Sequence, residues 1–181
     1  MPRHARLDIT GALHHIMVRG INKGALFQDD LDRTKFRERL ETCIVETMCS
    51  VYAWVLMDNH VHLLVRSGAK GVSTLMRKLL TWYAVYYNRR HHRSGHLFEN
   101  RYKSVLCQEE QYFLTLVRYI HLNPVRAGSV TQPRELDSYP WSGHAALAGK
   151  ERNAWMDTAY VLLQFAPTEQ RARNAYRRFV E

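Results

Sequence analysis

Cysteine and long apolar segments are scarce in this 181-residue chain, and each shortage excludes a class of protein. The three cysteines, Cys43, Cys49 and Cys107, form no C-x-x-C pair and are odd in number. We therefore expect reduced core thiols in a cytosolic protein and no disulfide framework. The first residues lack the apolar core of a signal peptide, and no run approaches the roughly 18 apolar residues of a membrane span. Secretion and membrane insertion are not expected.

Acidic residues are also in the minority, because 17 Asp and Glu stand against 26 Lys and Arg, which gives a formal charge of +9. Basic side chains displace condensed counterions from phosphates, so this balance favours a polyanionic partner. Nucleic acid is the first candidate and an anionic membrane surface the second. The hydrophobic fraction of 46% is enough for the core of one domain.

Hydrophobic periodicity predicts the element order β-α-β-β-α-β-α. This order indicates an α+β fold, an antiparallel sheet with helices packed against it. The predicted strands cover residues 13–18, 51–57, 60–66 and 101–107, and the predicted helices cover residues 31–48, 74–88 and 109–122. Residues 130–181 begin with a proline-marked connection and end in a basic helix over 168–179. We predict that they form a small C-terminal helical extension, packed on or beside a domain of residues 1–129.

The run MDNHVHLLV carries the sharpest chemical signal. Residues i and i+2 of a strand point to the same face about 6.5 to 7 Å apart, so His60 and His62 can share one metal ion. Val61 and Leu63 then point the other way, into the core. The alternative is a pair of hydrogen-bonded histidines on a half-exposed sheet face, since an H-x-H triplet is common by chance. Asp58, in the turn before them, is expected to serve that turn.

A metal-dependent nuclease also needs a nucleophile and a further ligand, and the third predicted helix offers candidates for both. In the run RYIHLNP, Tyr119 and Asn123 are four residues apart and project from one helical face. His121 lies about 200° around the helix from Tyr119, so a surface or packing role is predicted for it. With ten tyrosines in the chain, an ordinary core role is the alternative for Tyr119. Its partner Asn123, followed at once by a proline, sets it apart.

Basic and aromatic residues alternate along the second predicted helix and its tail. Aromatic rings can stack on unpaired bases while arginines contact phosphates. However, Leu75, Leu79, Trp82 and Tyr86 also fit a buried helical stripe, and we assign these aromatics to the core. The predicted contacts with DNA are therefore basic residues: Arg19, Arg89, Arg90, Arg93, Arg101 and Lys103.

These motifs resemble those of the HUH single-strand DNA endonucleases, in particular the one-tyrosine transposases and their REP-associated branch. The resemblance covers about residues 13–145 and rests on five segments in the family's order: HIMVRGINKGALF, WVLMDNHVHLLV, HLFENRYKSVL, RYIHLNPVRAG and YPWSG. It implies a ferredoxin-like antiparallel sheet with His60 and His62 on a central strand. It also implies that they bind Mg²⁺ or Mn²⁺ with the amide of Asn123, which stands where other branches carry glutamine.

The resemblance further implies a reaction and a substrate. Tyr119 would attack a phosphodiester whose oxygens the ion polarises, leaving a 5′-phosphotyrosine and a 3′-hydroxyl that can be rejoined. The substrate would be single-stranded DNA beside a hairpin from repetitive extragenic palindromes, in the bacterial cytoplasm near the nucleoid. The protein would act as a monomer or a homodimer. Two alternatives stay open: a catalytically inert hairpin-binding protein, and a nuclease in which water replaces Tyr119.

Overall fold

A computed structural model describes residues 8–107 and 109–181. Four strands form one sheet in the order β2-β3-β1-β4, and every pairing is antiparallel. The strands are β1 (Leu13–Arg19), β2 (Ser50–Met57), β3 (His60–Arg66) and β4 (Lys103–Cys107). The helices α1 (Asp30–Thr47) and α2 (Gly71–Arg90) connect the strands in the order βαββαβ. The strand order of the sheet makes β1 and β3 the central strands. The predicted ferredoxin-like α+β sheet is confirmed.

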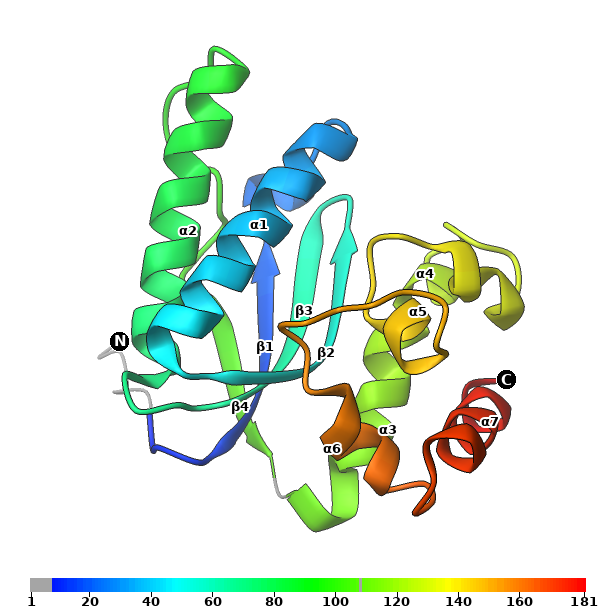
Figure 1. Ribbon diagram of the computed structural model, residues 1–181. Helices are drawn as coiled ribbons and strands as arrows, with labels where there is room; N and C mark the ends of the chain where they lie inside the picture. Colours follow the sequence, from blue (N-terminus) through cyan, green and yellow to red (C-terminus); the bar gives the residue numbers. More distant parts are fainter. Residues whose placement is uncertain (1–7, 108) are drawn as a thin grey trace.

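Different helices cover the two faces of this sheet (Figure 1). The long helices α1 and α2 pack against each other on one face, and α3 (Glu109–His121) lies on the other face with the C-terminal elements. None of the helices in the described ranges is long and apolar enough to cross a membrane. The shorter elements are η1 (Ile21–Lys23), α4 (Asn123–Arg126), η2 (Pro133–Ser138), α5 (His144–Leu147), α6 (Thr158–Leu163) and α7 (Glu169–Val180).

The face covered by α1 and α2 is apolar because alternate residues of the central strands are apolar. Ile16, Val61 and Leu63 are fully buried, as predicted for the two residues of β3. Phe36 of α1 and Tyr83 of α2 meet edge to face above them, with ring centroids 4.9 Å apart. Burying side chains of this size stabilises a fold by roughly 1.5 to 3 kcal/mol each. This face therefore contributes substantially to the stability of the fold.

The buried stripe of α2 differs from the predicted one. Leu79 is buried as expected, but the aromatic residues that continue the stripe are Tyr83 and Tyr87. Trp82 is 37% exposed and stacks in parallel on Tyr86, with ring centroids 5.4 Å apart. Assigning Trp82 to the core was therefore wrong, whereas Tyr86 is partly buried against the core. The physical reason is that this stripe repeats every four residues, which places Trp82 toward the helix exterior.

The helix α2 also begins three residues before its predicted start. Gly71 has a positive φ of 78° and turns the chain into the helix. The carboxylate of Asp8 then accepts hydrogen bonds from the backbone N–H groups of Val72 and Ser73, at 2.9 and 2.8 Å. A carboxylate at a helix N-terminus satisfies donors that have no partner within the helix. Since Asp8 is more than 60 residues away, no local pattern predicts it.

Residues 130–181 pack along the outer edge of β2 as well as on α3. Isolated bridges pair Val51 with Met156 and Val55 with Ser142. The helix α7 packs on α3 and buries Tyr176 completely. The segment is thus a layer of helices that also covers one edge of the sheet. The helices α5 and α6 were not predicted, because four and six residues are too few to show a clear period. A domain boundary after residue 129 stays a prediction.

Candidate active site

The predicted site residues come together on the face of the sheet opposite α1 and α2. His60 and His62 lie side by side on β3, with ring centroids 5.1 Å apart. The ring of Tyr119, from α3, stands edge-on to His62 with the centroids 5.8 Å apart. His62 is only 3% exposed, whereas Tyr119 is 36% exposed. The candidate nucleophile is therefore accessible from solvent, with the histidine buried beneath it.

The turn between β2 and β3 fixes the first histidine. The carbonyl of Asp58 accepts a hydrogen bond from the backbone N–H of Leu26 at 2.7 Å, and its carboxylate pairs with Arg33 at 2.5 Å. The side-chain oxygen of Asn59 lies 2.7 Å from Nδ1 of His60. Asp58 thus serves the turn, as expected, and Asn59 holds the imidazole of His60 by one nitrogen. The other nitrogen of that ring is left for the site.

Asn123 is the first residue of α4, two residues after the end of the tyrosine helix, and it also reaches His60. Its amide nitrogen donates to the carbonyl of Tyr119 at 2.9 Å and, at a longer 3.4 Å, to the carbonyl of Ile120. Its side-chain amide lies within reach of the imidazole of His60. The ring of Tyr119 contacts the guanidinium of Arg126, 4.8 Å from the ring centroid. The end of α3 and the short helix α4 together therefore supply the phenol, an amide beside the histidines and a nearby positive charge.

Burial keeps both histidines of the pair neutral. It lowers the pKa of His62 to about 3, with smaller contributions from His15 and His60. Burial also lowers the pKa of His60, and the charge of Arg19 adds to this, while the hydrogen bond to Asn123 opposes it. Neutral imidazole is the form that binds metal ions, so the electrostatics of the site suit metal ligands at neutral pH.

The donors at this site fit a divalent ion with open positions. Within residues 8–107 and 109–181, no group of three or more His, Cys, Asp or Glu is arranged to hold a metal. The family resemblance implies the amide oxygen of Asn123 as a third protein ligand, beside His60 and His62. Imidazoles suit transition-metal ions, and an amide oxygen suits Mg²⁺ or Mn²⁺. The remaining coordination positions would be open to other oxygen ligands.

His15 is the site residue that the sequence analysis missed. It lies on β1, and its Nε2 is 2.9 Å from Nδ1 of His62. Its ring stacks on His62 at 5.1 Å and stands edge-on to Tyr119 at 5.9 Å. The hydrogen bond orients the ring of His62 and leaves the Nε2 atom of that ring for a ligand, as outer partners of metal-binding histidines do. The sequence signal was the second of two adjacent histidines on a predicted strand. Only the register of β1 against β3 places this histidine beside His62.

Three of the predicted DNA contacts lie together at the end of β1 and the start of β4. Arg19, Arg101 and Lys103 line one small cavity, and Arg19 pairs with His60 across the two strands. All three side chains are exposed. They therefore form a basic surface that adjoins the histidine pair.

The other three lie at the C-terminal end of α2, where they differ from one another. Arg89 and Arg93 are exposed. Arg90 instead forms ion pairs with Asp29 at 2.6 Å and with the fully buried Asp32 at 2.5 Å. These contacts join the end of α2 to the start of α1, so Arg90 has a structural role. Its contact with DNA stays a prediction.

His121 has the packing role that was predicted as one of its two alternatives. It is fully buried, and its Nδ1 lies 2.8 Å from the hydroxyl of Tyr176 in α7. That hydroxyl also lies 2.8 Å from Nδ1 of His144, whose other nitrogen is 3.1 Å from Asp137. This buried chain of hydrogen bonds fastens the tyrosine helix to the C-terminal layer.

A ferredoxin-like sheet with a histidine pair facing a tyrosine helix defines an HUH-type enzyme, and comparison with known families agrees. The family described as "Transposase IS200 like" matches residues 9–123, which is more than half of the chain. The matched part includes His60, His62, Tyr119 and Asn123. The chain therefore belongs to this family of one-tyrosine transposases and is an enzyme.

Two solved structures show how far the likeness extends. The structure of a REP-associated tyrosine transposase bound to a REP hairpin matches 87% of this chain and 98% of its own, with 16% identity and a TM-score of 0.66. This match supports the fold. A candidate transposase from Deinococcus radiodurans R1 matches 66% of this chain and 95% of its own, with 15% identity and a TM-score of 0.44. No curated protein sequence matches the chain.

Proposed function

We propose that this enzyme cleaves single-stranded DNA beside a hairpin, with Tyr119 as the nucleophile and His60, His62 and Asn123 as the metal ligands. The observation that carries the proposal is the ring of Tyr119, whose centroid lies 5.8 Å from that of His62, with Asn123 two residues beyond the end of the same helix. The relative with the same fold was solved with a REP hairpin, and the charge of +9 suits a DNA partner.

The chemistry that this site supports is a transfer between two esters. The phenol oxygen of Tyr119 forms a bond to the scissile phosphorus while the bond from phosphorus to the 3′ oxygen breaks. A phenol is protonated at neutral pH, so its proton leaves during attack, and the departing 3′ oxygen takes one up. The guanidinium of Arg126, 4.8 Å from the ring, favours the charge that develops on the phenol. A bound divalent ion would polarise the phosphate oxygens.

The products are a 5′-phosphotyrosine and a free 3′-hydroxyl, and the reaction can run backwards. One phosphate ester replaces another of similar energy, so no nucleotide cofactor is needed. A 3′-hydroxyl that attacks the phosphotyrosine restores a phosphodiester and releases Tyr119. When that hydroxyl belongs to another strand, the result is strand transfer, the activity expected of a transposase.

The basic surface beside the site would hold the DNA backbone. Arg19, Arg101 and Lys103 adjoin the histidine pair and would contact phosphates near the cleaved bond. Arg89 and Arg93, exposed beyond the end of α2, would contact phosphates farther along the substrate. Tyr119 lies beside His62 of the same chain, which supports action in cis, in a monomer or in a homodimer.

The test is a labelled oligonucleotide that carries a hairpin, incubated with Mg²⁺ or Mn²⁺ and analysed on a denaturing gel. The wild-type protein should form a covalent protein–DNA adduct, and Tyr119→Phe should form none. Tyr112→Phe is the matched control, because this tyrosine lies two turns earlier on α3 and is 53% exposed. His60→Ala should lose cleavage and retain hairpin binding.

Other outcomes would favour the two alternatives. Cleavage without an adduct, unchanged in Tyr119→Phe, would show that water is the nucleophile. Hairpin binding without cleavage by either ion would indicate an inert binding protein. Loss of both binding and cleavage in His60→Ala would point to a structural role for that histidine.

A further inference from the structure

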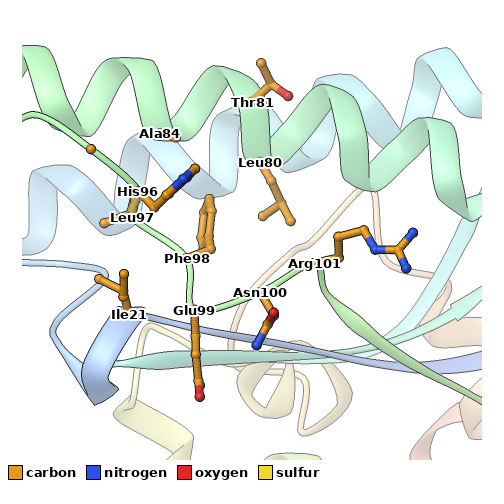
Figure 2. A pocket seen from close by; sticks show the side chains of 11 residues that line it. Ile21, Leu80, Thr81, Ala84, His96, Leu97, Phe98, Glu99, Asn100 and Arg101 are labelled. Atoms are coloured by element: carbon orange, nitrogen blue, oxygen red, sulfur yellow. The ribbon is translucent and has the colours of Figure 1, made fainter. Parts of the chain in front are cut away.

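A cavity of about 530 Å³ opens between α2 and the segment that leads into β4 (Figure 2). Leu80 reaches down from α2, and Phe98 reaches up from the segment into the same space. Ala84 of α2 and Leu97 of the segment extend these apolar walls, with the exposed His96 at the edge. The space is therefore bounded by apolar surface, including one aromatic ring, above and below.

The cavity adjoins the candidate active site through its rim. Glu99, Asn100 and Arg101 line this cavity and also the small cavity that holds Arg19 and Lys103. Figure 2 shows Glu99 and Asn100 on the side of the segment away from α2. The backbone N–H of Glu99 donates to the carbonyl of Arg19 at 3.0 Å. Arg19 is the register partner of His60 on the neighbouring strand. The rim of the cavity therefore lies near the strand ends that carry the histidine pair.

The chemistry of the lining favours an unpaired base over a row of phosphates. Phosphates need positive charge, and Arg19, Arg101 and Lys103 supply it on the smaller cavity. Apolar walls and the ring of Phe98 suit the flat face of a base.

We propose that this cavity binds one unpaired nucleobase of the DNA strand whose phosphates lie on the smaller basic cavity. The inference rests on the function proposed above and adds a binding site for the base. The volume lies within the range of roughly 300 to 1,000 Å³ that is usual for small-molecule pockets. A base within a duplex must first lose its stacking and pairing, so a single-stranded nucleotide turns its base into this space at a lower cost. The cavity would therefore select single-stranded DNA at this one position.

The experiment uses a protein variant that fills the cavity and a DNA probe that lacks the base, each alone and both together. Ala84→Leu adds volume inside the cavity, and Val85→Leu, at the neighbouring position that is 51% exposed, is the matched control. The probe is a fluorescein-labelled DNA hairpin with a short single-stranded flank, selected from a randomised library on the wild-type protein. A set of probes with one abasic site at each flank position completes the design. Affinity is measured by fluorescence anisotropy, and folding by thermal unfolding.

Ala84→Leu should weaken binding of the intact probe by about fivefold or more, and Val85→Leu should leave it unchanged. In the wild type, an abasic site at one flank position should cause a loss of similar size. That abasic site should cause no further loss of affinity in Ala84→Leu, because each change alone already removes the base from the cavity.

Two results would overturn the inference. Binding by Ala84→Leu at the wild-type level, or losses that simply add, would show that no base occupies the cavity even though the adduct on Tyr119 still forms. Failure of the wild-type protein to form that adduct would instead remove the proposed function, and the base site with it.

Discussion

The two faces of the sheet use the same strands for different purposes. On the α1/α2 face, Val61 and Leu63 are fully buried among apolar side chains. On the α3 face, His60 and His62 alternate with them along β3 and face Tyr119. Because successive side chains of a strand point to opposite faces, neighbouring residues of β3 serve the core and the candidate site in turn. Substitutions on one face should leave the property of the other face intact.

Neighbouring histidines of β1 show the same division. His14 and His15 are adjacent and point to opposite faces. His14 is buried, and its Nδ1 lies 3.0 Å from the hydroxyl of Ser104 on β4. His15 hydrogen-bonds to His62 in the candidate site. Both histidines are thus partnered within the sheet, but only the second touches the residues proposed to act on DNA.

The largest expected effect comes from breaking the apolar face. Leu63→Ala should lower the free energy of unfolding by about 2 to 5 kcal/mol, because the side chain is fully buried and a cavity would remain. Urea denaturation measures this loss. Cleavage per folded molecule should stay at the wild-type level. His60→Ala, on the opposite face of the same strand, should abolish cleavage while the free energy of unfolding changes by less than about 1 kcal/mol. A folded Leu63→Ala protein without cleavage would show that the two faces are coupled.

A smaller effect should separate the two histidines of β1. His15→Ala should weaken Mn²⁺ binding about 10- to 100-fold, because His62 loses the hydrogen bond that orients its ring. His15→Gln, whose amide can accept the same bond, should recover part of this affinity. Isothermal titration calorimetry measures the binding, and His14→Ala is the control on the same strand. Equal losses in the His14 and His15 variants would mean that the effect is structural.

The smallest effect concerns the C-terminal layer and pH. Burial lowers the pKa of His144, and the charge of Arg177 adds to this, while Asp137 opposes it; Tyr176 and His121 complete its surroundings. The folded state therefore keeps His144 neutral, whereas the unfolded state binds a proton below the usual pKa of about 6.5. The contribution of His144 to stability should be fully present above about pH 6.5 and should be lost as the pH drops below it, by at most about 1.4 kcal/mol per pH unit.

Urea unfolding of the wild type and His144→Gln over a series of acidic pH values measures this contribution. The variant should show a flatter dependence than the wild type, because it lacks the titrating ring. Parallel curves would show that His144 does not contribute to acid sensitivity.

The sequence by itself determined the elements and the core of the site. Strand and helix periods follow from local backbone geometry, so the alternation in HVHLLV and the four-residue spacing of Tyr119 and Asn123 were visible in a single sequence. These patterns, with the family resemblance, predicted the sheet, its flanking helices and the histidine pair that the structure brings together with Tyr119.

Only the tertiary structure decided the contacts between distant segments. His15 and His62 are 47 residues apart, and Arg90 lies 58 residues from Asp32. Such pairs depend on strand register and on how α1 meets α2, which local periodicity does not fix. For this reason Arg90 was predicted at a DNA surface and is found in an ion pair. For the same reason His15 went unrecognised, although it touches the residue at the centre of the site.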